Sequence, residues 1–368
     1  MSTRVGRRLG QQGGFSLVEL LISTAIMLVV TGSIFRMMNP AQGSAQAQPE
    51  VADMQQRMRI GTDALFKELI IAGAGPYQGP VTGSLVGFFA PIVPRRVGDT
   101  GADPTTGSNS FKDDRITLSY IPNSYSQTTI SASMPPNSAE LKVNDQPNCP
   151  SGQALCGFVE GMEVVIFDTA GHWDTFTITH VQDSAGHLQH RGQDLNYAYD
   201  VGASVTQIVT NTYYLDRTTR QLKKYDGHAS DVALVDNVVD LKFQYYGDPN
   251  PPTQPKPLLG TANCLYDAAG NLIAQPTLTT ADGSLAELTP TLLSNGPYCG
   301  SGDNQFDVDL LRIRKVKVTM RLQTGNASLR GNDSTRFTNA GTAVGGERYV
   351  PDYQMQFEVA PRNLNLTR

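Results

Sequence analysis

The sequence lacks the short motifs that identify common enzymes, and it has few charged residues. Asp, Glu, Lys and Arg make up only 17% of its 368 residues. It contains no GxSxG, Walker A or HExxH motif, no catalytic Cys–His arrangement and no internal repeat. Ser, His and Asp are abundant, but no pattern brings them together. We therefore expect a protein that is not an enzyme and that uses no cofactor.

Excess positive charge is also missing. The formal net charge is −5, and the first 14 residues carry three arginines and no acid, so the remaining residues sum to −8. The net negative charge of the remaining residues argues against general nucleic-acid binding, although it does not exclude a local basic patch.

Cysteine is scarce, and no CxxC pair occurs. Cys149 and Cys156 bracket "CPSGQALC", while Cys264 and Cys299 flank a polar insertion. An even number of cysteines in an exported chain favours disulfides, and four cysteines allow three pairings. We prefer Cys149–Cys156 with Cys264–Cys299. A four-thiolate zinc site is disfavoured because such sites normally contain CxxC pairs.

One long apolar run stands out near the amino terminus. Phe15 to Phe35 are 21 residues, enough to cross a bilayer, and Glu19 is the only charged residue among them. A charged residue inside a membrane costs roughly 2.5–3.5 kcal/mol on insertion scales. The arginines before the run place residues 1–14 in the cytoplasm by the positive-inside rule. A plain signal anchor would leave Glu19 unexplained, and the run is too long for an ordinary secretory signal, although "AQA" further on mimics its cleavage site.

The stretch "GFSLVELLIS" (residues 14–23) resembles the class III signal of type IV prepilins and type II secretion pseudopilins. The resemblance implies cleavage by prepilin peptidase between Gly14 and Phe15, N-methylation of Phe15, and a role for Glu19 as the family's signature acid. The residue before the cleavage glycine is often basic in this family, whereas here it is Gly13.

The resemblance also suggests a physical role for Glu19. Cleavage gives Phe15 a cationic amine, and a carboxylate in an apolar environment is tolerated when it is paired. In a filament of packed apolar helices, Glu19 of one subunit would meet the Phe15 amine of a neighbour, which makes it an assembly and register device. The alternative is that Glu19 lies near the headgroups and makes no contribution.

Helical character continues beyond the apolar run. An apolar stripe at helical spacing predicts a face packed on a globular domain; its members are Val51, Met54, Met58, Leu65 and Leu69. Pro40 and Pro49 predict a kink or short break, and "AGAGPYQGP" ends the helix near residue 72.

The later sequence predicts antiparallel strands, each with one buried face. The apolar residues expected to face the core are Val239, Leu241, Phe243 and Tyr245; Val316, Val318, Met320 and Leu322; and Tyr353, Met355, Phe357 and Val359. Further strands are expected at "DRITLSYI", "GMEVVIFD" and "DTFTITHV", and a hairpin turning at residues 216–220. Residues 98–112, 247–262 and 324–348 read as loops.

This order of elements is similar to the pilin fold, an α+β fold with a long amino-terminal helix packed on an antiparallel sheet. We expect a leader at 1–14, a helix at 15–72 that spans the membrane at 15–35, and a β-rich domain at 73–368 outside the cytoplasm. The segments "YYLD", "LKKYDG", "ALVDNVVDLKFQYY" and "VAPRNLNL" resemble PilW-like minor pilins, which are related to J-type pseudopilins.

Two polar clusters are candidate metal sites. His172, His180, His187 and His190 lie close in sequence, but without zinc-site spacing we expect surface histidines. The stretch "GDNQFDVD" offers Asp303, Asn304, Asp307 and Asp309 as weak calcium-ligand candidates; it lacks EF-hand spacing, so we expect a solvated loop and no metal. We expect Trp173 to be a core or hairpin residue.

The sequence thus predicts a structural subunit of a type IV pilus, a minor pilin that helps to prime or cap it. The expected partners are other major and minor pilins, prepilin peptidase, the inner-membrane assembly platform and membrane lipid. The expected location is the bacterial inner membrane and then the pilus on the cell surface. The alternatives are a type II secretion pseudopilin, a tip adhesin or DNA-uptake subunit, and an anchored periplasmic enzyme.

Overall fold

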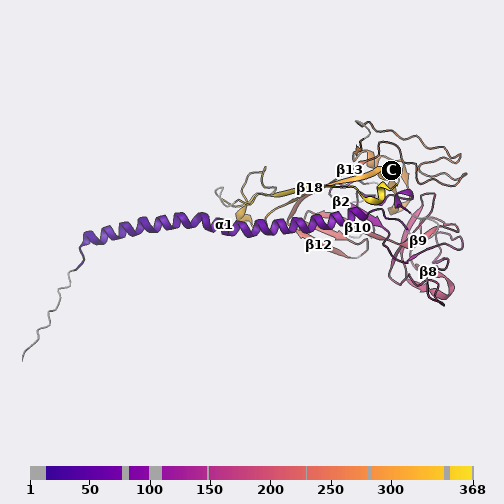
Figure 1. Cartoon of the computed structure of the whole chain (residues 1–368), viewed down its shortest axis with the longest axis horizontal. Coiled ribbons are helices and arrows are strands. Elements are labelled where there is room, and N and C mark those ends of the chain that lie inside the picture. Colours follow the sequence, from indigo (N-terminus) through magenta and orange to yellow (C-terminus); the bar gives the residue numbers. More distant parts are fainter. Residues whose placement is uncertain are drawn as a thin grey trace, which may run out of the picture. The chain divides into compact units, whose positions relative to one another are not determined.

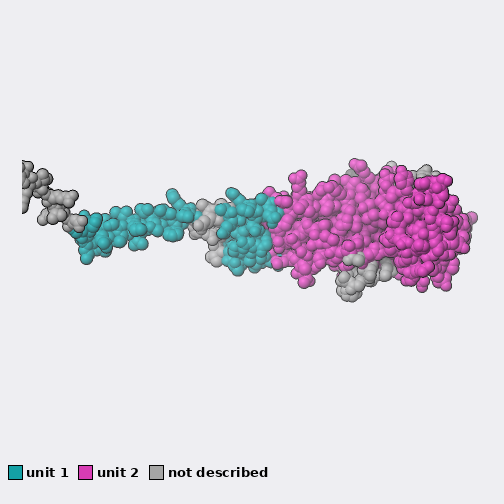
Figure 2. All heavy atoms as spheres, turned by 90° about the horizontal axis from the view of Figure 1, so that it is seen from below, with its two compact units in different colours: residues 1–53, 324–351 teal, residues 54–323, 352–368 magenta. Residues whose placement is uncertain are grey.

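A computed structural model describes residues 14–76, 83–98, 110–146, 149–228, 230–280, 284–343 and 349–366; for residues 39–44 and 303 it describes the backbone only. The chain divides into two compact units (Figure 2). Unit 1 comprises residues 1–53 and 324–351, and unit 2 comprises residues 54–323 and 352–368.

The amino-terminal helix α1 runs from Leu17 to Ile71, 55 residues in all (Figure 1). Pro40 and Pro49 both lie inside it, so the break suggested at these prolines is absent. A proline removes a single helical donor. The neighbouring residues, mostly Ala and Gln, are good helix formers, which lets the helix continue across both sites.

Unit 1 contains the first part of α1 and the segment 324–351. The Thr324 hydroxyl donates to the Glu50 carboxylate at 2.7 Å, and the rings of Phe337 and Tyr349 meet edge to face at 5.6 Å. Apart from the 3-10 helix η6 (Ala327–Leu329), the described residues of this segment form no helix or strand, as the loop prediction expects.

Unit 2 contains a four-stranded antiparallel sheet in the order β14–β13–β17–β18. Its strands are β13 (Val238–Gly247), β14 (Ala286–Leu288), β17 (Ile313–Leu322) and β18 (Tyr353–Val359). The predicted core-facing rows of β13 and β17 are confirmed except at Val239, which is only half-buried. A register shift between Val238 and Asp240 turns Val238 into the core instead.

A second sheet of unit 2 has five strands, in the order β1–β2–β10–β11–β12. Its strands are β1 (Ile92–Val93), β2 (Arg115–Tyr120), β10 (Val209–Asp216), β11 (Gln221–Tyr225) and β12 (Asp231–Asp236). Strands β10 and β11 form the predicted hairpin, with Arg220 in the left-handed region at φ 55°.

These two sheets and α1 enclose the larger hydrophobic cluster, which we call the first core. Of the predicted helix stripe, Met54, Met58, Leu65 and Leu69 are buried, whereas Val51 is 37% exposed and that part of the prediction is wrong. The helix approaches β17 closely at Gly61, where a Cβ atom would lie 2.8 Å from Cε of Met320.

The second core is a smaller cluster formed by residues between β2 and β10. Two sheets supply it, in the orders β3–β9–β5–β6 and β4–β8–β7. Their strands are short: β3 (Gln127–Thr129), β4 (Glu140–Lys142), β5 (Glu163–Phe167), β6 (Trp173–Thr177), β7 (His180–Gln182), β8 (His187–Gln189) and β9 (Ser204–Gln207).

The remaining regular pieces are very short. They are the pair β15 (Tyr298–Cys299) and β16 (Phe306–Asp307), and the 3-10 helices η1 (Leu85–Gly87), η2 (Asp183–Ala185), η3 (Leu292–Ser294), η4 (Gly302–Asn304), η5 (Val308–Arg312) and η8 (Arg362–Asn365). The predicted α+β fold, with one long amino-terminal helix and antiparallel sheets, is confirmed.

Candidate assembly site at the amino terminus

Gly14 and Phe15 lie just before α1 and are open to their surroundings. Phe15 is 89% exposed. A Cβ atom built on Gly14 would meet no atom within 4 Å, and its φ lies outside the left-handed region. The fold itself therefore places no demand for glycine at position 14, so a strict requirement would have to come from a partner that handles this peptide bond.

Ser16 and Glu19 form a reciprocal cap at the start of α1. The Ser16 hydroxyl accepts a hydrogen bond from the Val18 amide at 3.2 Å, and the Glu19 carboxylate accepts one from the Ser16 amide at 3.0 Å. This is the S-x-x-E capping box, which satisfies amide groups that have no partner inside the helix. Sequence reasoning missed Ser16, although the motif "SLVE" was a visible signal.

The capping box gives Glu19 a partner in the isolated chain. Its carboxylate also lies at the positive end of the helix dipole, where negative charge is favoured. Glu19 therefore has a structural role in the isolated chain, as a helix cap. Capping is a third possible role of Glu19, beside pairing with a neighbour's Phe15 amine and a position near the headgroups that makes no contribution.

The segment Leu17–Met38 of α1 is long and apolar enough to cross a membrane, with a mean hydropathy of 2.1 and none of its most apolar window buried in the protein. Its hydroxyl side chains bond back to the helix: Thr24 donates to the Leu20 carbonyl at 2.9 Å and Ser33 to the Val29 carbonyl at 2.8 Å. Such bonds let small polar residues occupy an apolar environment.

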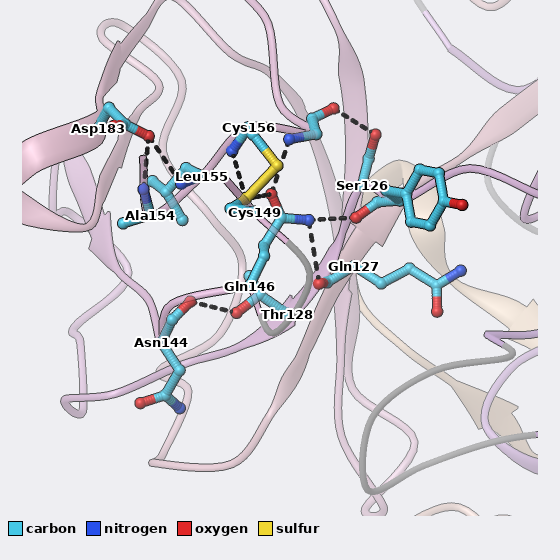
Figure 3. The surroundings of a disulfide bond; sticks show 12 residues. Ser126, Gln127, Thr128, Asn144, Gln146, Cys149, Ala154, Leu155, Cys156 and Asp183 are labelled. Carbon is cyan, nitrogen blue, oxygen red and sulfur yellow. Dashed lines mark hydrogen bonds between the residues drawn. A yellow bond between two sulfur atoms is a disulfide. The ribbon is translucent and has the colours of Figure 1, made fainter. Parts of the chain in front are cut away.

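The structure links Cys149 to Cys156 and Cys264 to Cys299, with Cα–Cα distances of 5.5 and 5.0 Å, which is the preferred pairing. Figure 3 shows the first disulfide with Asp183, Ala154 and Leu155 near it. The Asp183 carboxylate beside it accepts hydrogen bonds from the Ala154 and Leu155 amides at 3.0 and 2.7 Å, so it fixes the loop that the disulfide closes.

The acidic stretch 303–309 is not the solvated loop that the sequence suggested. Asp307 and Asp309 are 3% and 1% exposed, and the side chain of Asp303 lies outside the described residues. Asp307 caps η5 by accepting from the Asp309 amide at 2.8 Å and binds the Gly296 amide at 2.7 Å. Burial raises the pKa of both carboxyl groups, that of Asp309 to about 6.

Asp309 pairs with Arg312, a fully buried arginine that sequence reasoning missed. The guanidinium of Arg312 also donates to the Pro249 and Pro276 carbonyls at 2.9 and 2.8 Å. It thereby ties residues 248–280 to the start of β17. This stretch includes the predicted loop 247–262 except for Gly247, which is the last residue of β13, and it lines a cleft of about 800 Å³.

The histidines do not come together as a metal site. His180 is exposed and His172 and His187 are half-buried, but His190 is fully buried, so the surface prediction is wrong for it. It packs against the Phe176 ring in the second core, and its Nδ1 lies 2.7 Å from the Gln193 carbonyl oxygen. Within the described residues, no three His, Cys, Asp or Glu side chains are placed to hold a metal ion.

Two buried groups in β6 have structural roles. Trp173 stacks on Phe89 at 4.5 Å in the first core, as expected of a core residue. The Asp174 carboxylate accepts hydrogen bonds from Asn196, the Tyr199 hydroxyl at 2.9 Å and the Asn304 amide at 3.3 Å. Burial raises the pKa of Asp174, and the hydrogen bonds from Asn196 and Tyr199 oppose that shift.

Comparison with known families identifies only the amino terminus. Residues 9–35 match the prokaryotic N-terminal methylation motif. No curated protein and no solved structure matches the chain. The chain therefore carries the class III signal of type IV pilin-like proteins, which confirms that part of the sequence prediction; the PilW-like subtype remains a prediction.

Proposed function

We propose that the protein is a minor pilin: a non-enzymatic subunit cleaved between Gly14 and Phe15, methylated at Phe15 and incorporated into a type IV pilus. The observation that carries the proposal is the methylation motif at residues 9–35, followed in the structure by helix α1, whose most apolar window has no buried residue. An apolar helix without a partner in its own chain needs lipid before assembly and neighbouring helices after it.

The β-rich part of the chain would lie outside the cytoplasm. Its four cysteines form two disulfides, which persist in oxidising compartments, and the arginine-bearing leader favours the cytoplasmic side. Other pilins, prepilin peptidase and the inner-membrane assembly platform are the partners this role requires. A pseudopilin of a type II secretion system would share all these features.

Glu19 provides the test, because two variants separate its possible roles. Glu19→Gln keeps a side chain that can complete the capping box but removes the charge that would pair with a neighbour's Phe15 amine. Glu19→Ala removes both. We expect both variants to insert and to be cleaved at Gly14–Phe15, yet to be depleted from filaments, because an unpaired buried amine costs about 3–5 kcal/mol.

Ser16→Ala is the matched control. It weakens the cap by about 0.5–2 kcal/mol while leaving the Glu19 charge in place, so incorporation should continue. The measurement is the ratio of this chain in sheared filaments to that in membranes, with mass spectrometry of the mature amino terminus. Normal incorporation of Glu19→Gln with depletion of Glu19→Ala would mean that capping is the whole role of Glu19, and normal incorporation of both would mean that Glu19 makes no contribution. An amino terminus other than Phe15 would overturn the proposed processing.

A further inference from the structure

Strand β18 is the longest edge strand of the described sheets. It has seven residues and pairs with β17 in unbroken register over its whole length. In contrast, β1 has two residues, β14 has three, and β12 carries aspartates at both ends and pairs with β11 through a register shift. Short length, bulges and charges are the usual protection of sheet edges, and β18 has no Lys, no Pro and no bulge.

The outer edge of β18 also leaves apolar surface open. The core-facing residues Tyr353, Met355 and Phe357 lie opposite Leu322, Met320 and Val318 of β17. The β17 residues are completely buried, whereas Tyr353 is 38% exposed and Met355 and Phe357 are half-buried. The row predicted to face the core is therefore only partly covered by the described residues.

Helix α1 forms the other wall of this open surface. The Thr62 hydroxyl lies 3.4 Å from the Met355 sulfur, and Phe66, one helical turn further on, is 42% exposed. Among the described residues, no backbone hydrogen bond reaches the outer edge of β18. The edge thus offers unpaired backbone groups beside a half-open apolar row.

We propose that β18 binds an extended segment of a different filament subunit, which adds to the sheet as a further strand. Its backbone pairs with β18, and alternate apolar side chains cover Met355, Phe357 and Phe66. The other side chains of the segment are polar, because they lie beside Gln354, Gln356 and Glu358 on the solvent face. That the partner belongs to the same filament rests on the proposed function.

A second copy of this chain fits the edge poorly. Helix α1 and β18 run in the same direction, because Thr62 lies at Met355 and the Ile71 carbonyl accepts from Asn363. An antiparallel pair of β18 strands would point the two α1 segments in opposite directions, although both must enter one membrane. A parallel pair of the same edges would place the apolar row of one copy beside the polar row of the other.

The test is site-specific photo-crosslinking of the full chain in sheared filaments. A benzophenone amino acid replaces Gln354, Gln356 or Glu358 in turn, with Val232 of β12 as the control position. We expect crosslinks from β18 to a single partner, and the crosslinked partner residue should move by two for each two-residue step of the probe. That ladder is the signature of a neighbouring strand.

A charge-inserting variant provides a second readout. Met355→Lys places a lysine in the open apolar row and should abolish the ladder, whereas Val232→Lys should leave it unchanged; formation of both disulfides reports that each variant folds. Crosslinks no stronger than those from Val232, crosslinks to a second copy, or crosslinks without the two-residue step would overturn the inference. If the chain is found in filaments without the ladder, the proposed function stands and this inference fails. A ladder in membranes with no chain in filaments would overturn the proposed function and the partner's place in a filament, and would leave only the strand addition at β18.

Discussion

The two cores of unit 2 are stabilised in different ways. The first core rests on ten-residue strands, β13 and β17, whose core-facing residues are almost completely buried, and on α1, which packs on them. The second core rests on strands of three to five residues. It adds the Asp183 and Asp174 carboxylates to apolar contact, while each core has one disulfide, Cys264–Cys299 in the first and Cys149–Cys156 beside the second. Short strands bury little apolar surface each, so polar contacts and the disulfide carry more of the stability of the second core.

The largest expected effect is in the first core. Leu65→Ala removes a fully buried side chain of α1 and should lower the free energy of unfolding by about 2–5 kcal/mol, because it leaves a cavity in the first core. Denaturant unfolding of the purified full chain in detergent measures it. Ile60→Ala, at a position 47% exposed, is the control and should change stability by less than about 0.5 kcal/mol.

Loss of the disulfide should act on the second core alone. Replacing Cys149 and Cys156 together by serine should cost about 2–4 kcal/mol. Hydrogen exchange should rise within residues 126–208 and stay slow in β17, since the central strands of the first core contain no cysteine. Equal loss of protection in both cores would show that they unfold as one unit.

Asp183 should have a smaller effect in the same region. Asp183→Ala leaves the Ala154 and Leu155 amides without their acceptor and should cost about 1–3 kcal/mol. Asp183→Asn keeps an acceptor oxygen and should cost less. If both variants unfold like the wild type, water replaces the carboxylate, and the two hydrogen bonds to Asp183 are not needed for stability.

The smallest change is expected at the hairpin of the first core. Arg220 has φ 55°, a conformation that glycine adopts without steric cost. Arg220→Gly should therefore raise stability by less than about 1 kcal/mol, as measured by the unfolding midpoint. A clear loss of stability would mean that the Arg220 side chain makes a stabilising contact.

Sequence periodicity predicted the first core better than the second. Alternation identified the buried rows of β13 and β17 because each is long enough for a period of two to be evident. The error at Val239 came from a register shift, which changes which residues face the core without any change in composition. In the second core, three-residue strands give no usable period, and the burial of His190 depends on the Phe176 ring rather than on its neighbours in sequence.

The sequence predicted only part of the amino-terminal site. Glu19 was identified by a family motif and by its charge in an apolar run, whereas its bond to the Ser16 amide required attention to helix caps. Asp309 was misread because a polar stretch between apolar residues usually indicates a solvated loop, and Arg312 was missed. The acceptors that satisfy the buried Arg312 include the Pro249 and Pro276 carbonyls, which are remote in sequence.

The Asp174 carboxylate has a consequence for how the sequence can change over time. Its side-chain donors come from separate stretches, at Asn196, Tyr199 and Asn304, and the Asn196 and Tyr197 amides donate to it as well. Loss of the acid alone would leave the buried Tyr199 hydroxyl unsatisfied, while loss of that hydroxyl would leave a buried carboxylate under-solvated. Substitutions at Asp174 and Tyr199 should therefore be inherited together, and relatives lacking Asp174 should carry an apolar residue at position 199.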